Sequence, residues 1–257
     1  MTRQQGGSII FFVLLFAVLF FVFDTKPKDV RVLEGATSLN AGGAEITKAL
    51  SGTKSKLPKD SLLLINSLES DLLAVAEDTA KAELLKKMSG WWYQKAEYYL
   101  AGYYAEKVAE LEKTDKAWAI AATTYTAGSS SGTEDQINSC REKAIKSFEN
   151  AISIAPQNVA HRVNLALCYA DHPPADNPMK GIQMLLELSK ESPDDVLVQI
   201  TLAKLAIKTG QYEKATARLN KLLEKNPDVK SANCLLSEIY MQTGDQAKAE
   251  LYSKKCN

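Results

Sequence analysis

The chain has 257 residues, of which 46% are hydrophobic and 24% charged, a composition typical of one or two globular domains. Its 31 basic side chains are balanced by 31 acidic ones, and lysines alternate with Glu and Asp along the chain. Binding to the phosphate backbone of a nucleic acid needs a concentrated positive surface. The charge pattern therefore argues against a nucleic-acid-binding function.

The N-terminal segment carries a long apolar run. After a short tail of residues 1–8, residues 9–23 are fifteen consecutive apolar residues, and no charge occurs between Arg3 and Asp24. As a helix, the uncharged stretch would span about 30 Å, which is the thickness of the hydrocarbon core of a bilayer. No small residues follow the run where a signal peptidase would need them, so we predict a transmembrane anchor over 9–23. A cleaved signal peptide is the alternative.

Two further segments precede the main domain. Residues 24–58 are rich in Gly, Ser, Thr and Lys, and we predict a flexible linker with one helical turn or more around 44–50. Within 59–81, Leu and Ile recur at three- and four-residue steps after Asp60, which we assign as the N-cap of a helix. This helix would cover the exposed side of the first repeat as a cap, and a dimer contact is the alternative.

The clearest pattern in the chain lies within residues 196–229. Small residues recur there where two helices would cross, larger ones fill the space beside them, a glycine marks the turn and a proline ends the second helix. The landmarks, in chain order, are Leu202, Ala203, Ala206, Gly210, Ala215, Leu219, Leu222 and Pro227. They predict an antiparallel pair of helices in about 34 residues.

The same landmarks recur before and after this unit. They predict five helix-turn-helix repeats, the last of them truncated, at 82–114, 115–158, 159–195, 196–229 and 230–257. This pattern resembles that of tetratricopeptide-repeat proteins, and the layout is similar to that of bacterial membrane-anchored repeat proteins. The resemblance implies an all-α solenoid with a concave ligand-binding face and without catalytic residues.

Two longer loops fall between the helices of the second and third repeats, at residues 128–132 and 172–178. After the first loop, Thr133 and Gln136 have the spacing of a capping box, which predicts the start of the next helix. Both loops would lie at the same edge of the stack. They extend a binding surface at that edge, or they are neutral insertions.

Motifs that carry chemistry are sparse. A metal site could be drawn from His161, Cys168 and His172, with Asp171 or Asp176 as the fourth ligand, but these residues lack the tight pairs of a structural zinc site. The sequence has no phosphate-binding glycine loop and no nucleophile motif. We therefore predict no enzymatic activity, no cofactor and no metal.

The cysteines bear on the cellular compartment. Cys234 lies early on the first helix of the last repeat and Cys256 late on the second, so the two would be neighbours in an antiparallel pair. We predict a candidate disulfide between them, which would imply an oxidising compartment. The alternative is two small apolar residues at a helix contact.

The side of the membrane follows from two opposing signals. Arg3 precedes the apolar run, whereas Lys26, Lys28 and Arg31 follow it. Because positive residues favour the cytoplasmic side of a membrane segment, this count slightly favours a cytoplasmic repeat domain. The short tail resembles a signal-anchor segment, which usually sends the following domain outward, and the candidate disulfide points the same way. We predict an extracytoplasmic or periplasmic repeat domain, with a cytoplasmic one as the alternative.

Side chains of the first helices that are not needed for packing would form a mainly apolar groove. It would bind an extended or helical segment of a partner protein, unless the strip is only inter-helix packing. We predict a membrane-anchored scaffold or adaptor for protein partners. The alternative is a permanent structural subunit of a membrane complex or a chaperone-like accessory factor. The predicted groove residues are Lys86, Tyr93, Thr123, Val163, Leu167, Ile200, Lys204, Ile207, Glu238 and Met241.

Overall fold

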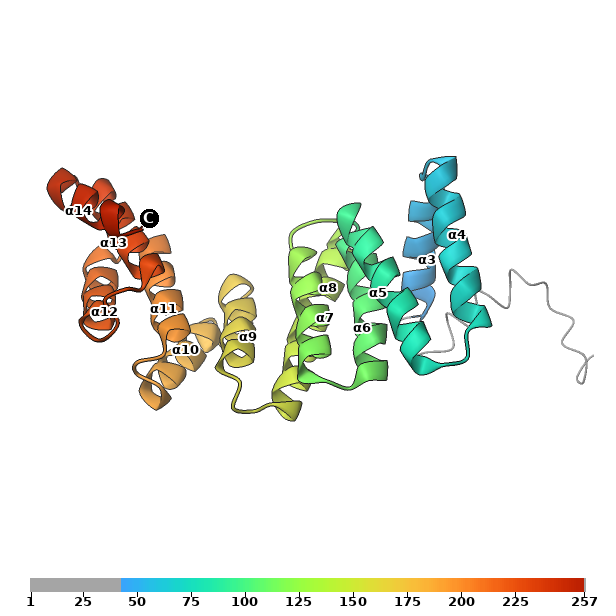
Figure 1. The fold of residues 1–257 in the computed structure, drawn as a ribbon, viewed down its shortest axis with the longest axis horizontal. Coiled ribbons are helices and arrows are strands. Elements are labelled where there is room, and N and C mark those ends of the chain that lie inside the picture. Colours follow the sequence, from blue (N-terminus) through green and yellow to red (C-terminus); the bar gives the residue numbers. More distant parts are fainter. Residues whose placement is uncertain (1–42, 257) are drawn as a thin grey trace, which may run out of the picture. The chain divides into compact units, whose positions relative to one another are not determined.

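The computed structural model of the chain describes residues 43–256, and this part consists of twelve helices without any strand (Figure 1). The helices are α3 Gly43–Lys54, α4 Lys59–Ala74, α5 Asp78–Gln94, α6 Tyr98–Glu112, α7 Asp115–Ala127, α8 Glu134–Ile154, α9 Val159–Asp171, α10 Lys180–Glu191, α11 Val196–Lys208, α12 Tyr212–Lys225, α13 Lys230–Gln242 and α14 Gln246–Cys256. In residues 43–256, no helix is both long and apolar enough to cross a membrane. The predicted anchor over 9–23 lies outside the described residues.

The chain divides into two compact units, Met1–Leu84 and Leu85–Asn257. In the described part of the first unit, Ile46 of α3 and Ile65 of α4 are buried. The Lys54 ammonium donates a 2.9 Å hydrogen bond to Oδ1 of Asn66 and pairs with Glu69, so polar contacts also join α3 to α4.

Three expectations for this unit are corrected. Residues Gly43–Lys54 of the predicted linker form a complete helix, because Ile46 supplies a buried contact that its sparse apolar pattern did not suggest. The N-cap of α4 is Pro58 rather than Asp60. Asp60 lies in the first turn, where its carboxylate interacts favourably with the helix dipole. The helix ends at Ala74, earlier than the predicted limit of 81.

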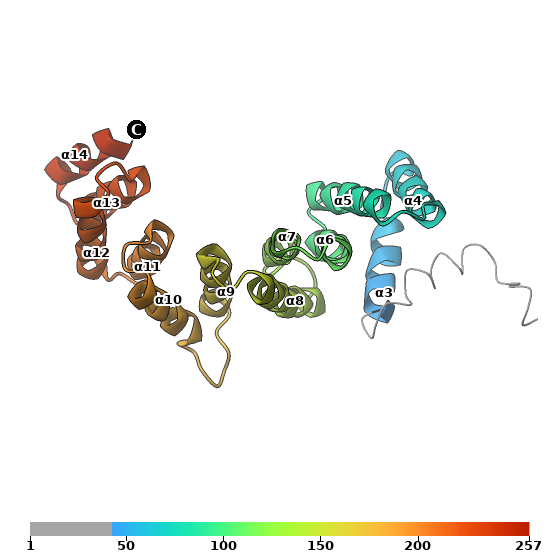
Figure 2. The same cartoon turned by 60° about the horizontal axis from the view of Figure 1, so that its bottom comes forward.

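In the second unit, helices pack pairwise in an α-solenoid arrangement. Figures 1 and 2 show α7 beside α8, α9 beside α10, α11 beside α12 and α13 beside α14. Each pair falls within one of the predicted repeats, and α5 begins four residues before the predicted limit at 82. The second helix of one pair also contacts the first helix of the next, as α12 does with α13.

Local chemistry sets where these helices begin. Thr114, Asn158 and Asp195 cap α7, α9 and α11, each accepting a hydrogen bond from a backbone N–H in the first turn. The predicted capping box of α8 is confirmed, because Thr133 and Gln136 exchange both hydrogen bonds. Gly210 adopts a φ of 71° in the turn between α11 and α12, a conformation that favours glycine.

Small residues mark the crossings inside each pair. Ala203 and Ala215 are both fully buried where α11 meets α12. Serine takes the first of these positions in two other pairs, where Ser89 donates 2.9 Å to the Ala101 carbonyl and Ser237 donates 2.9 Å to the Ala249 carbonyl. The helices therefore approach closely enough for a side chain on one to bind the backbone of the other.

Candidate protein-binding surface

The ten predicted groove residues lie on the first helices α5, α7, α9, α11 and α13, but the structure divides them by exposure. Leu167 and Ile207 are half-buried, whereas Val163 and Ile200 are buried. The remaining six side chains are exposed: Lys86, Tyr93, Thr123, Lys204, Glu238 and Met241.

The assignment of Val163 and Ile200 to the groove is corrected. Val163 is fully buried in a cluster with Leu185 and Leu188 of α10. Ile200 belongs to the next cluster, with Leu219 of α12 and Leu236 of α13. At both positions the apolar strip is inter-helix packing, so a partner could not reach these side chains.

Three exposed apolar residues on the same first helices were missed from the sequence. Ile120 of α7 is 61% exposed, and Val196 and Leu197 of α11 are 37% and 43% exposed. With Met241 of α13, which is 65% exposed, they place large apolar side chains at the surface of three first helices. Ile120 directly precedes two alanines, which was an available signal, whereas no small-residue landmark adjoins Leu197.

Charged side chains accompany these apolar ones. Lys204 and Glu238 are exposed, and neither has an ion-pair partner in the part of the chain that the structure describes. Lys86, in contrast, forms a 2.7 Å ion pair with Glu112 of α6. Lys208 forms a 3.1 Å ion pair with Asp171, which joins α11 to α9. Lys204 and Glu238 therefore keep charges available to a partner.

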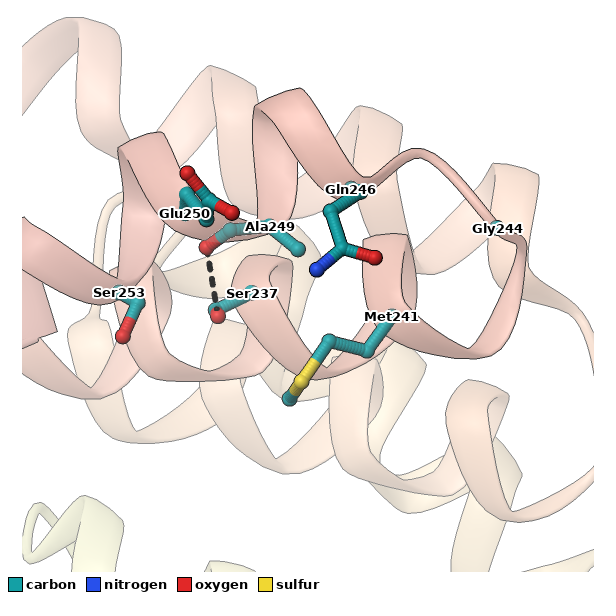
Figure 3. Close-up of a pocket in the computed structure, with 7 residues that line it drawn as sticks. All are labelled: Ser237, Met241, Gly244, Gln246, Ala249, Glu250 and Ser253. Atoms are coloured by element: carbon teal, nitrogen blue, oxygen red, sulfur yellow. Dashed lines mark hydrogen bonds between the residues drawn. The ribbon is translucent and has the colours of Figure 1, made fainter.

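A pocket of about 300 Å³ opens on the last helix pair (Figure 3). Two of its lining residues are joined by a hydrogen bond, which Ser237 of α13 donates to the carbonyl of Ala249 of α14. Met241 and Gln246 lie towards one end of the pocket, and Glu250 and Ser253 lie towards the other. The complete lining is Ser237, Met241, Gly244, Gln246, Ala249, Glu250 and Ser253.

A disulfide holds the same pair together. Cys234 of α13 is bonded to Cys256 of α14, with 4.8 Å between their Cα atoms. Cys140 and Cys168 are buried and are not part of a disulfide. Burial raises the pKa of the Cys168 thiol, which disfavours the reactive thiolate. The two pairs of cysteines therefore sit in different chemical environments.

The residues that the sequence offered as metal ligands make other contacts in the structure. His161 Nε2 lies 2.9 Å from Oδ2 of Asp115 and 2.9 Å from the amide nitrogen of Asn158. The hydrogen bond with His161 lowers the pKa of Asp115. Cys168 Sγ lies 3.8 Å from the Thr126 hydroxyl. Residues 43–256 contain no group of three His, Cys, Asp or Glu side chains that could hold a metal ion.

The C-terminal third of the chain matches a known family. Residues 177–233 and residues 231–257 match two models of the tetratricopeptide repeat. The chain is also 33% identical, over 90 residues, to lipopolysaccharide assembly protein B of Haemophilus influenzae. That match spans 34% of this chain and only 22% of the relative.

Solved structures show a similar fold. A tetratricopeptide repeat protein from Parabacteroides merdae aligns over 82% of this chain and 77% of its own, with a TM-score of 0.51 and 15% identity. PilW, described as a widely conserved type IV pilus biogenesis factor, aligns over 68% of this chain and 76% of its own, with a TM-score of 0.45 and 21% identity. At 15% identity, the likeness to the Parabacteroides merdae protein extends to the fold alone.

Proposed function

Since the chain is a tetratricopeptide-repeat protein, we propose that it is a scaffold that binds a partner protein along the first helices of successive pairs. The observation that carries this proposal is the exposure of Ile120, Leu197 and Met241 on α7, α11 and α13. Isolated apolar side chains are common at protein surfaces, and second helices also expose some of them. Ile120, Leu197 and Met241, however, lie on first helices, which line the binding face in this repeat architecture.

The chemistry of these helices suggests the kind of segment that would bind. Apolar side chains of the partner would be buried against Ile120 and Leu197, which supplies affinity. Lys204 and Glu238 carry charges without a partner in residues 43–256, so they would select a segment with complementary charges. The buried Val163 and Ile200 would support this surface from below without contacting the partner.

Photo-crosslinking in intact cells tests the proposal. A photoreactive amino acid at Thr123, Lys204 or Glu238 would form an adduct with the same partner protein from all three first helices. Matched positions on the second helices, Glu187 of α10 and Glu224 of α12, are equally exposed and should not form it. Equal adducts from both sets of helices would contradict binding along the first helices.

Two substitutions sharpen this test. Ile120→Asp and Leu197→Asp should each reduce the yield of the adduct, because a charge would then have to be buried against the partner. Leu186→Asp on α10 makes the same change at a comparably exposed leucine and should leave the yield unchanged. Loss of the adduct in the Leu186 variant as well would indicate a general effect on the fold.

A second candidate function is that of an accessory factor or a permanent subunit in the assembly of cell-envelope components. The relative named for lipopolysaccharide assembly favours it, although the similarity covers only 90 residues. Size-exclusion chromatography of the detergent-solubilised protein separates the two functions. Stable co-migration with other proteins would favour the subunit, and a free chain would favour transient binding.

Attachment to a membrane through residues 9–23 belongs to the same proposal. Its support is the uncharged apolar run, which lies outside the described residues. An anchor would confine the repeats to the membrane surface and raise the effective concentration of a membrane-bound partner. The chain should then remain in membranes during a carbonate wash, and its release into the wash would contradict an anchor.

The cysteines supply a test for the side of the membrane. If the repeats lie outside the cytoplasm, Cys234 and Cys256 should react with a maleimide only after reduction, because the disulfide would persist there. Cys140 and Cys168 should stay unlabelled in the folded protein because they are buried. Labelling of Cys234 and Cys256 without reductant would favour a cytoplasmic domain.

A further inference from the structure

We propose that the outer face of α13 and α14 binds the same face of a second copy of this chain, with the two α14 helices antiparallel. This face surrounds the pocket in Figure 3, and α14 of the copy would fill that pocket. The inference goes beyond the binding of a different protein along the first helices, and it does not depend on it.

The preceding pair shows what kind of element this face accepts. Ala203, Ala215 and Leu219 are fully buried in a cluster to which α13 contributes. The corresponding residues of the next repeat, 34 positions later in the sequence, are Ser237, Ala249 and Ser253, and all three line the pocket. The pocket is therefore the place that a packed helix occupies one pair earlier.

The side chains at this place are more polar than their counterparts. Ser253 stands where α12 has Leu219, and Ser237 stands where α11 has Ala203. Met241, the counterpart of Ile207, is 65% exposed. This face therefore keeps the shape of a helix-binding site but offers less apolar area. Such a face suits a partner that binds reversibly rather than one that is permanently packed.

The charges of α14 favour a second copy as that occupant. Glu250 and Lys254 are four residues apart and exposed, and neither has an ion-pair partner among the described residues. In an antiparallel pair whose twofold axis crosses the outer face of α14 at the level of residue 252, Glu250 would face Lys254 of the partner subunit. The symmetry repeats that contact, so one helix pairing would satisfy four charges.

The opposite side of α14 is already fixed within the chain. The disulfide joins its last residue to α13. Tyr252 stacks on Tyr240 with 5.6 Å between the ring centroids, and its hydroxyl lies 3.4 Å from Oδ1 of Asn220. The outer face is therefore preorganised, which lowers the entropic cost of docking. A contact between two short helices is small, so we expect a weak, reversible dimer.

Sedimentation velocity of the full-length chain in mild detergent, from about 5 to about 500 µM, tests the proposal in a range suited to small interfaces. We expect a concentration-dependent dimer. Glu250→Lys and Lys254→Glu should each weaken it roughly tenfold or more, because two attractive pairs become two repulsive ones. The double variant, and an equimolar mixture of the two single variants, should recover the wild-type affinity because attraction is restored.

Glu224→Lys is the matched control, since it reverses an exposed charge on α12, away from this face, and should leave the dimer unchanged. Circular dichroism of each variant checks that its helices are intact. A chain that is monomeric throughout the concentration range would overturn the proposal. So would a dimer that neither single charge reversal weakens, because it would form through another surface.

Discussion

Two places in the second unit where three consecutive helices meet are packed with different side chains. Where α11, α12 and α13 meet, the fully buried residues are aliphatic, with Ala203, Leu219 and Leu236 at the centre. Where α6, α7 and α8 meet, the ring of Tyr125 lies against Gly102. Its hydroxyl donates a 2.6 Å hydrogen bond to Glu106, which also accepts a 2.8 Å hydrogen bond from Lys143.

The comparison distinguishes what the helix contacts share, a small residue, from what varies between them, the side chains that fill the remaining volume. Each junction has a small residue at a helix contact, Gly102 against Tyr125 in one and the fully buried Ala203 in the other. The remaining volume is filled by an aromatic ring with a polar link or by branched aliphatic chains. The two family models match residues 177–257, which include the aliphatic junction and not the aromatic one.

The largest expected effect tests the aliphatic junction. Leu219→Ala should lower the free energy of unfolding by about 3 kcal/mol, because it leaves a cavity among fully buried neighbours. Urea denaturation followed by circular dichroism measures this change. Leu186→Ala, at an exposed leucine of α10, should change the stability by less than about 0.5 kcal/mol. Equal losses in the two variants would mean that Leu219 is not part of a close-packed core.

The aromatic junction is tested by adding one methyl group. A Cβ atom on Gly102 would overlap the ring of Tyr125, so the ring would have to move. Gly102→Ala should therefore cost about 2 kcal/mol in the same denaturation experiment.

Gly90 provides the matched control for this substitution. It lies within α5, and an added Cβ would meet no atom within 4 Å. Gly90→Ala should stabilise the protein by about 0.5 kcal/mol or more, because alanine loses less backbone entropy than glycine in a helix. If both substitutions stabilise the chain, the close contact of Gly102 with Tyr125 does not exist in solution.

The aliphatic junction was also the easier one to predict from the sequence. Its small and branched residues recur at the repeat spacing, so the helix pair over 196–229 followed from the pattern alone. No repeat spacing in the sequence predicts the contact of Gly102 with Tyr125. The glycine and the aromatic residue lie on different helices, and their contact depends on how those helices pack.

The binding surface was less predictable, because helical phase locates a face but not the depth at which it lies. Val163 and Ile200 have the phase of groove residues, yet side chains from α10 and α12 cover them. Ile120 and Leu197 are exposed although neighbouring positions are buried. Exposure depends on side chains far away in the sequence, which periodicity within one helix does not describe.

A smaller effect distinguishes the polar link from the ring that carries it. Tyr125→Phe keeps the ring against Gly102 but removes the hydrogen bond to Glu106, and it should lower the free energy of unfolding by about 1 kcal/mol.

Burial, followed by the nearby Glu106 carboxylate, raises the pKa of Tyr125 well above its usual value. In a spectrophotometric titration, Tyr125 should therefore ionise only above the usual pH range of a tyrosine. Tyr93→Phe, at an exposed tyrosine, should be neutral in the denaturation experiment.

The smallest expected effect concerns the contact between α7 and α9. Asp115 and His161 occupy the repeat positions at which the aliphatic region has Val196 and Ala232. The hydrogen bond with His161 lowers the pKa of Asp115 below 3.8, its ordinary value in an unfolded chain. The unfolded state therefore binds the proton more readily, and the stabilising contribution of Asp115 is present above that value and is lost as the pH falls through the folded-state pKa.

Urea midpoints at pH 7 and at about pH 3 should reveal this link, since the second value lies below the ordinary pKa of a carboxyl group. Asp115→Asn should reduce stability at pH 7, and its difference from the wild type should shrink at the lower pH. Asp176→Asn, at an exposed residue of the loop before α10, should show no such dependence. If the stability difference between the Asp115 variant and the wild type were the same at both pH values, the contact between α7 and α9 would stabilise the fold through packing. It would then act as the aliphatic residues do where α11, α12 and α13 meet.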